Sequence, residues 1–113
     1  MASSQSTVDF VLEQIAAAGE VSARKMFGEY GVYCDGRIVG LICDDSFFVK
    51  PTKAGEAFAP DLEQAPPYPG AKPYIRIDAG RLEDADWLAD LVRRTAAELP
   101  LPKPRKPKKR RAK

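Results

Sequence analysis

Residues 30–43 read YGVYCDGRIVGLIC, and this stretch decides the fold. Two runs rich in aromatic, β-branched and other apolar residues, Tyr30–Cys34 and Arg37–Cys43, flank the pair Asp35-Gly36. An Asp-Gly pair between two such runs is a strong hairpin signal, because a two-residue type I′ turn needs positive φ at both central positions. The stretch therefore predicts an antiparallel β-hairpin with its tip at Asp35-Gly36.

Further segments of strand character extend this hairpin on both sides. Residues 21–26 before it are extended and mixed in polarity, and Asp44-Asp45 after it turns the chain into Ser46–Lys50. The segment Tyr74–Asp78 alternates and is expected to return to the sheet as another strand. Four prolines within residues 65–73 exclude a helix or a central strand there. We predict a meander of three or four antiparallel strands, joined by one strand that returns later.

Two helices are predicted from periodicity before and after the meander. The first is expected over residues 6–17, with Ser6 as its N-cap. Its apolar residues recur at helical spacing: Val8, Val11, Leu12 and Ile15. A shorter helix is expected over residues 52–59, with Ala57 and Phe58 facing inward.

The clearest helical pattern covers residues 83–98. Acidic residues lie at its N-terminal end and Arg93-Arg94 near its C-terminal end, as the helix macrodipole favours. Its apolar stripe consists of Trp87, Leu88, Leu91, Val92 and Leu99. Strands in the middle of the chain with helices around them predict a two-layer α+β fold, in which the N- and C-terminal helices cover one face of an antiparallel sheet. We expect Trp87 and Phe27 to share its core.

Charge divides the 113-residue chain near residue 100. Eight of the 18 basic residues lie in residues 101–113, which contain no acid, and the first 100 residues hold the other 10 with all 16 acids, a net formal charge of −6. We predict a folded acidic domain over residues 1–100 and a disordered tail over residues 101–113, because prolines and mutually repelling charges leave the tail little to bury. The basic residues of the tail are Lys103, Arg105, Lys106, Lys108, Lys109, Arg110, Arg111 and Lys113.

The basic tail carries the sharpest functional signal in the sequence. Clustered lysine and arginine suit contact with consecutive phosphates through counterion release, so we expect the tail to bind DNA or RNA without sequence preference. A solubilising terminus accounts for the same composition about as well, and a nuclear import signal is a third interpretation. Composition leaves these three interpretations open.

Catalytic, metal and cofactor sites are not expected. The chain has no histidine and two cysteines, which removes Ser-His-Asp and Cys-His arrangements and argues against a metal centre. Asp44-Asp45 could bind a cation and Asp84 with Asp86 could act as paired acids. Turn formation and helix-terminus charge explain these residues better. We therefore predict a non-enzymatic protein without cofactor.

Both cysteines are predicted to be buried free thiols. The hairpin register places Cys34 opposite Arg37, and Cys43 follows six residues later on the same strand, about 20 Å away at ~3.3 Å per residue. A disulfide needs Cα atoms within about 7 Å. Free thiols, an N-terminus without signal-peptide features and the lack of a long apolar run predict a cytoplasmic protein that does not enter membranes.

One set of motifs resembles a known family. Residues 24–33 read RKMFGEYGVY and are followed by Asp35-Gly36-Arg37 and Phe48-Val49-Lys50. This order is similar to the TfoX N-terminal domain family, with its Met-Phe-Gly run, its Asp-Gly hairpin and a strand ending in lysine. The resemblance covers roughly residues 7–100. The motif residues, which we interpret as mainly structural, are Arg24, Lys25, Met26, Phe27, Gly28, Tyr30, Gly31, Tyr33, Asp35, Gly36 and Lys50.

The resemblance implies a two-layer fold with an antiparallel sheet, and it brings no catalytic residues. It also implies kinship with bacterial TfoX/Sxy regulators of competence genes, which act with a transcription activator, the cyclic-AMP receptor protein. Those regulators carry a second, C-terminal domain, where this sequence has the basic tail. A cationic groove around Arg24, Lys25 and Lys50 that meets an acidic partner is an alternative to the structural interpretation of the motif.

The function predicted is that of an accessory or regulatory protein of transcription or the nucleoid. Its folded domain is expected to bind a protein partner, with the transcription machinery as a candidate, and its tail to hold the complex near nucleic acid. We expect a monomer or a weak homodimer. Two alternatives remain: a protein-interaction module with a solubilising tail, and an enzyme or small-ligand binder with a deep pocket converging on Arg24, Lys25, Glu29 or Lys50.

Overall fold

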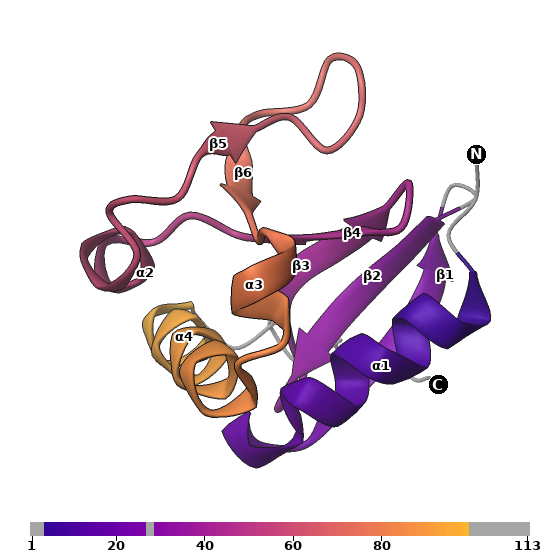
Figure 1. The fold of residues 1–113 in the computed structure, drawn as a ribbon, viewed down its shortest axis with the longest axis horizontal. Coiled ribbons are helices and arrows are strands. Elements are labelled where there is room, and N and C mark those ends of the chain that lie inside the picture. The colour runs from indigo at the N-terminus through magenta and orange to yellow at the C-terminus, as the bar shows by residue number, and fades with distance from the viewer. Residues whose placement is uncertain (1–3, 27–28, 100–113) are drawn as a thin grey trace, which may run out of the picture.

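One antiparallel sheet with helices packed on it makes up the fold (Figure 1). A computed structural model describes residues 4–26 and 29–99. The elements in chain order are α1 (Gln5–Gln14), the 3₁₀ helix η1 (Ala16–Ala18), β1 (Val21–Met26), β2 (Glu29–Cys34), β3 (Arg37–Cys43), β4 (Ser46–Val49), α2 (Lys53–Phe58), β5 (Gln64–Ala65), β6 (Tyr74–Arg76), α3 (Ala79–Leu82) and α4 (Ala85–Glu98). The strand order is β1-β2-β3-β4-β6-β5. The predicted α+β class, the meander and the returning strand are therefore confirmed.

The turn chemistry of the two central hairpins is also confirmed. Asp35 and Gly36 have φ values of 52° and 83° at the tip between β2 and β3. Asp44 and Asp45 have φ values of 53° and 58° at the tip between β3 and β4. Aspartate tolerates this left-handed region because its short side chain bonds locally. Both tips thus take the positive-φ conformation that matches the right-handed twist of the flanking strands.

A β-bulge in β3 changes which alternate residues of this strand face each side of the sheet. Val32 pairs with Gly40 but Tyr33 pairs with Ile38, so Val39 is the extra residue. Beyond the bulge, Ile42 faces the main core, while Leu41 and Cys43 belong to a second apolar cluster. Strands β3 and β4 lie very close together at Gly40. A Cβ added to Gly40 would lie 2.2 Å from the carbonyl oxygen of Phe48.

The main core lies between the sheet and the helices α1 and α4 (Figure 1). Its fully buried side chains include Val8, Val11, Ile15, Val32, Ile42, Phe47, Ile75, Leu88, Leu91 and Val92. The predicted stripe of the last helix is confirmed at Leu88, Leu91 and Val92, whereas Trp87 and Leu99 are only partly buried. None of the helices in the described part of the chain is long and apolar enough to span a membrane.

Two local predictions are wrong, and each has a physical reason. The N-cap of α1 is Ser4, whose side chain accepts a hydrogen bond from the Thr7 amide, and not Ser6. Ala57 is exposed. Helix α2 packs against α4 at Gly55, where a Cβ would lie 3.2 Å from the Thr95 hydroxyl, and this contact turns position 57 to the opposite side of the helix.

The Trp87 ring lies at the edge of the core. It stacks on Phe58 with 5.5 Å between ring centroids, and the Arg81 guanidinium lies 4.4 Å from its centroid. The predicted contact with Phe27 lies outside the described residues. A large ring at this position keeps part of its surface in water, so it gains less from burial than a fully enclosed one.

We expect Trp87→Ala to cost about 2–3 kcal/mol, less than the ~3–5 kcal/mol of a fully buried tryptophan. The loss combines reduced apolar burial with the lost stacking on Phe58 and the lost cation–π contact with Arg81. Urea unfolding of the wild type and the variant measures it. A cost below ~1 kcal/mol would contradict the packing of α4 against α2 and α3.

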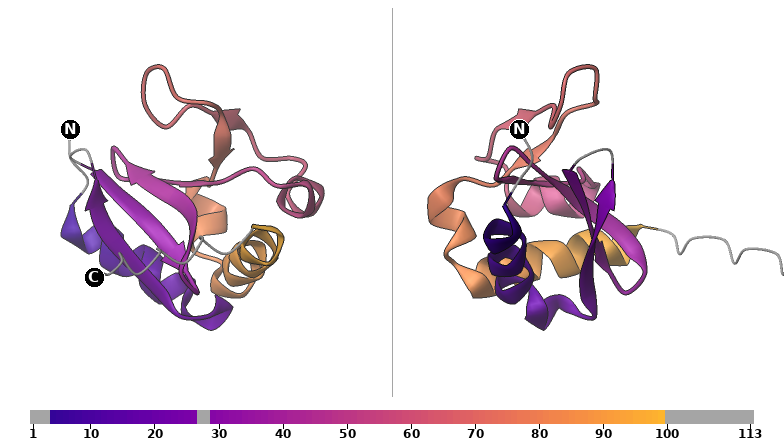
Figure 2. Two further views of the ribbon diagram at one scale, coloured as in Figure 1. Left: turned by 180° about the vertical axis from the view of Figure 1, so that it is seen from behind. Right: turned by 90° about the vertical axis from the view of Figure 1, so that its right-hand side faces the viewer.

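No helix of the described residues covers the opposite face of the sheet. Viewed from behind, strands β1 to β3 face the reader without a helix in front of them (Figure 2). Leu41, Cys43 and Phe48 form a second buried cluster on this face. Partly buried side chains pack over that cluster: Met26, Ile38, Ala65 and Tyr74. Ala65 ends β5 and Tyr74 begins β6, so the proline-rich segment between these two strands starts and ends beside the cluster.

Candidate functional site

A groove of about 660 Å³ opens on the face that the helices leave uncovered. Its walls are the ends of β1, β2 and β3 on one side and the segment between β5 and β6 on the other. We call it the tyrosine–proline groove, and its lining residues are Met26, Glu29, Tyr30, Leu41, Cys43, Asp44, Pro67, Tyr68 and Pro69. Its volume lies within the range of known ligand and peptide pockets.

The floor of the groove depends on two residues of the family motif. The Met26 side chain lies over β2 and extends toward Ile38. It has room to do so because residue 31 is glycine, which has no side chain. A Cβ on Gly31 would lie 3.0 Å from the Met26 methyl group and 3.4 Å from Cδ1 of Ile38. Gly31 therefore lets the flexible methionine side chain lie flat on the sheet. Methionine is well suited to such a surface because its polarizable thioether adapts to irregular partners.

The outer wall of the groove is a proline-flanked tyrosine. Pro67 is buried, whereas Tyr68 is 53% exposed and belongs to the few large hydrophobic residues exposed in the described chain. A turn that places the Ala71 amide 3.1 Å from the Tyr68 carbonyl oxygen, with Gly70 at φ 87°, fixes this segment. Prolines on both sides limit the backbone freedom of Tyr68. A large amphipathic ring is thus presented at low entropic cost, as is common at binding interfaces.

The charges at one end of the groove are acidic. Glu29 and Asp44 lie together there, and the Glu29 carboxylate accepts a 3.0 Å hydrogen bond from the Asp44 amide. None of the residues that line the groove is lysine or arginine. The site therefore offers an apolar, aromatic floor that ends in negative charge.

The surroundings of Cys43 disfavour its thiolate form. Burial raises the pKa of its thiol, and the charges of Glu29 and Asp44 raise it further. Burial also raises the pKa of Cys34, with the charge of Asp35 as the second cause. Thiol reactivity requires the thiolate, so the raised pKa values lower the reactivity of both groups at neutral pH.

Both cysteines are free in the structure, as predicted. Cys34 belongs to the helix-covered core and Cys43 to the opposite cluster, so the sheet separates them. We expect native protein to react slowly with a chromogenic thiol reagent, and unfolded protein to titrate two thiols per chain without prior reduction. An oxidised pair in protein from a reducing cytosol would contradict the placement of these residues on opposite faces.

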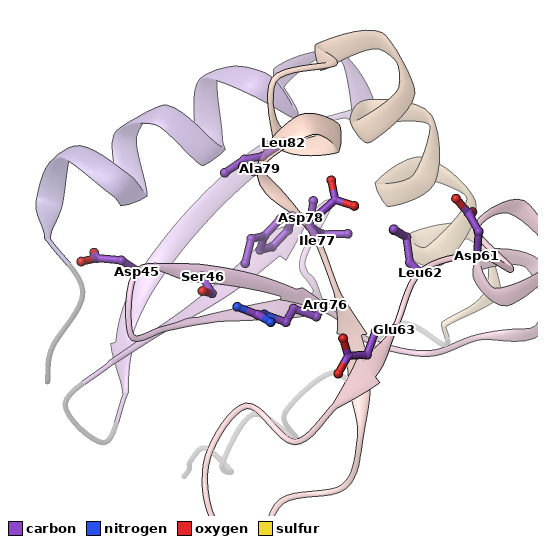
Figure 3. Close-up of a pocket in the computed structure, with 11 residues that line it drawn as sticks. Asp45, Ser46, Asp61, Leu62, Glu63, Arg76, Ile77, Asp78, Ala79 and Leu82 are labelled. Atoms are coloured by element: carbon purple, nitrogen blue, oxygen red, sulfur yellow. The ribbon is translucent and has the colours of Figure 1, made fainter.

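A second hollow of about 480 Å³ lies on the other side of the turn between β3 and β4 (Figure 3). It is lined by four carboxylates and one arginine: Asp45, Asp61, Glu63, Asp78 and Arg76. We call it the acidic hollow. Metal binding has no support there, since no group of three or more histidine, cysteine or acidic residues within residues 4–26 and 29–99 is arranged to hold an ion.

Structural roles explain most of the charge in the acidic hollow. Asp45 accepts hydrogen bonds from the Ser4 amide (2.8 Å) and the Thr7 hydroxyl (3.0 Å), and the Ser4 bond is the main cause that lowers its pKa. Asp61 forms a 3.0 Å ion pair with Arg81. Asp78 caps α3 by accepting a 2.8 Å hydrogen bond from the Arg81 amide. These carboxylates join α1, α3 and the loops, and we give the hollow a structural role.

The cationic residues of the motif do not converge on either hollow. Arg24 and Lys25 are exposed on β1, and the Arg24 guanidinium lies 5.9 Å from the centroid of the Tyr33 ring. Lys50 directly follows β4. Neither the groove nor the acidic hollow includes any of the three among its lining residues, and Glu29 alone of the four proposed pocket residues lines the groove.

The remaining predicted residues have mixed outcomes. Asp35 and Gly36 lie at the predicted hairpin tip, and Asp35 accepts a 2.9 Å hydrogen bond from the amide of Glu20, the residue before β1. Phe27, Gly28 and the eight basic tail residues lie outside the described residues. The wall residue Tyr68 was not predicted as a site residue. The signal available in the sequence was an aromatic residue between two prolines.

Comparison with known proteins supports the family resemblance. The model of the TfoX N-terminal domain matches residues 13–99, a range that contains the groove, both central hairpins and α4. The chain is also 45% identical over 108 residues to an uncharacterized 12.7 kDa protein in the trpE 5′ region of Spirochaeta aurantia, covering 96% of this chain and 93% of that protein. The protein therefore belongs to the TfoX N-terminal domain family.

Proposed function

We propose that the protein is a non-enzymatic accessory protein of transcription or the nucleoid. Its folded domain binds a protein partner in the tyrosine–proline groove, and its basic tail contacts nucleic acid. The division of charge carries this proposal: the tail has eight basic residues and no acid, and the first 100 residues have a net formal charge of −6. Membership of a family that includes transcription regulators supports it.

The folded domain is a poor surface for phosphates. Three of its basic side chains are engaged with carboxylates, since Arg93 and Arg94 both contact Asp90 and Arg81 contacts Asp61. Non-specific nucleic-acid binding depends on uncompensated cations that displace condensed counterions. Residues 101–113 supply such uncompensated cations, with eight basic residues and no acid.

The groove fits an extended protein segment with apolar side chains and basic flanks. Apolar side chains would contact Met26, Leu41 and the Tyr68 ring, and basic flanks would meet Glu29 and Asp44. Truncating the exposed tyrosine should remove a large share of the contact, because aromatic residues dominate the energetics of small interfaces.

Affinity capture from native cells tests both halves of the proposal. Four baits are compared: the full chain, residues 1–100, Tyr68→Ala and Phe10→Ala. Phe10 is the matched control because it is a large hydrophobic residue exposed on α1, away from the groove. After nuclease treatment, the full chain, residues 1–100 and Phe10→Ala should retain the same proteins, and Tyr68→Ala should lose them.

Without nuclease, residues 1–100 should recover far less nucleic acid than the full chain. Proteins that Tyr68→Ala retains as well as the full chain would contradict the groove as the docking site. Equal recovery of nucleic acid with and without residues 101–113 would contradict the role of the tail.

A further inference from the structure

The tail has the composition of a ligand for the groove on its own domain. Residues 100–107 read PLPKPRKP, and the following six residues add five more positive charges. Proline-rich segments favour the polyproline II conformation, which has low conformational entropy to lose. Grooves lined by aromatic side chains bind such segments, and nearby acidic groups select those with basic residues.

The groove has the complementary features on its described surface. Two tyrosines, Tyr30 and Tyr68, line it together with apolar side chains, and Glu29 and Asp44 supply negative charge at one end. No cation lies among the lining residues to oppose a basic segment. A proline-rich segment that also carries basic residues thus matches the aromatic floor and the acidic end of the groove.

The described chain ends on the side of the molecule from which the tail would have to reach the groove. Helix α4 ends at Glu98 on the side opposite α1, as the side view in Figure 2 shows, and the groove lies on the sheet face opposite the main core. In the polyproline II conformation the 14 residues that follow Leu99 span about 43 Å at ~3.1 Å per residue. This length exceeds the two shorter dimensions of the molecule, 30 and 28 Å, whereas residues 100–107 alone span about 25 Å. The tail as a whole can therefore reach the groove from where α4 ends, with its later residues in the groove.

We propose that the tyrosine–proline groove binds the chain's own proline-rich, basic tail, within residues 100–113, so that the folded domain and nucleic acid compete for the tail. This inference rests on the proposed function in taking the tail as the nucleic-acid contact. A tethered segment has an effective concentration in the millimolar range. A contact with Kd of about 1 mM therefore suffices to hold roughly half of the tails. A partner with a similar segment would displace the tail and leave it available to nucleic acid.

A labelled peptide of residues 100–113 tests the groove directly. It is titrated by fluorescence anisotropy, at low salt, with a chain of residues 1–100, which keeps every core residue from Val8 to Ala96. We expect saturable binding that Tyr68→Ala weakens at least about five-fold and that Phe10→Ala leaves unchanged. Asp44→Asn should weaken it about two- to three-fold, and asparagine tolerates the positive φ at that turn position.

A second peptide separates recognition of prolines from attraction of charge. It carries glycine at positions 102, 104 and 107 and keeps all eight positive charges. We expect it to bind more weakly than the natural peptide, because glycine removes the preformed extended conformation. Equal binding of both peptides, together with no effect of Tyr68→Ala, would overturn the proposal by showing a contact of charge alone elsewhere on the domain.

The full chain gives the second readout. Tyr68→Ala should raise its affinity for a DNA duplex by up to about two-fold, because release from the groove increases the fraction of free tail from about one half toward one. Peptide binding without any DNA binding by the full chain would support the groove assignment and contradict the proposed function. Absence of peptide binding to residues 1–100 at low salt overturns the inference whatever the DNA result.

Discussion

Phe47→Ala is expected to remove about 3–5 kcal/mol of folding free energy, a large fraction of the ~5–15 kcal/mol that stabilises a typical domain. Phe47 is fully buried and is the largest of the side chains with almost no exposure. It lies on β4 opposite Ile42, and its ring edge comes within 3.2 Å of where a Cβ on Gly40 would lie. Alanine would leave a cavity between the sheet and the helices that these rigid strands cannot close.

The matched control for this change is Phe10→Ala. Phe10 is 36% exposed on α1, so the same chemical truncation should cost less than about 1 kcal/mol. Urea unfolding of the wild type and both variants measures the difference as a shift of the midpoint at constant slope. Equal costs at the two positions would contradict the register of β3 with β4.

The sheet could be predicted from the sequence because its turn signals are local. Asp35-Gly36 and Asp44-Asp45 favour positive φ through their own side chains and backbones, whatever the rest of the chain does. Helix α4 could also be predicted from the sequence, because several of its buried residues repeat at helical spacing. The acidic residues at its start were predicted as favourable charges at the helix N-terminus, and the structure adds that Asp84 is the N-cap, accepting a 3.2 Å hydrogen bond from the Trp87 amide.

The features that escaped prediction depend on contacts between distant segments. Ser4 and Ser6 are equally good N-caps by residue type, but the Ser4 amide donates a 2.8 Å hydrogen bond to Asp45, which lies 41 residues away in sequence. Two-residue β5 and four-residue α3 are too short for any periodic signal. The groove likewise depends on sheet pairing and on the segment between β5 and β6, which together bring Met26, Leu41 and Tyr68 to one place.

Deleting residues 101–113 is expected to abolish non-specific DNA binding. The remaining chain carries a net formal charge of −6 and repels phosphate. The full chain should bind duplexes of any sequence at roughly 10⁻⁴–10⁻⁶ M near physiological salt. If about five of the basic residues engage phosphates, log K should fall against log salt with a slope of about −4 to −5.

Two further variants of the tail define the contact. Replacing Lys108-Lys109-Arg110-Arg111 with alanines should flatten the salt slope by up to about three to four units. The melting temperature of residues 1–100 should remain close to that of the full chain, because every core residue lies between Val8 and Ala96. A large drop in melting temperature would show that the tail contributes to the core.

An anisotropy titration of one labelled DNA duplex with the full chain and with residues 1–100, each at two salt concentrations, tests the central claim most directly. The proposal predicts micromolar or weaker binding by the full chain that weakens steeply with salt, and no measurable binding by residues 1–100 at either concentration. Equal affinity of the two chains would contradict it, because the folded domain itself would then have to carry the phosphate-binding surface.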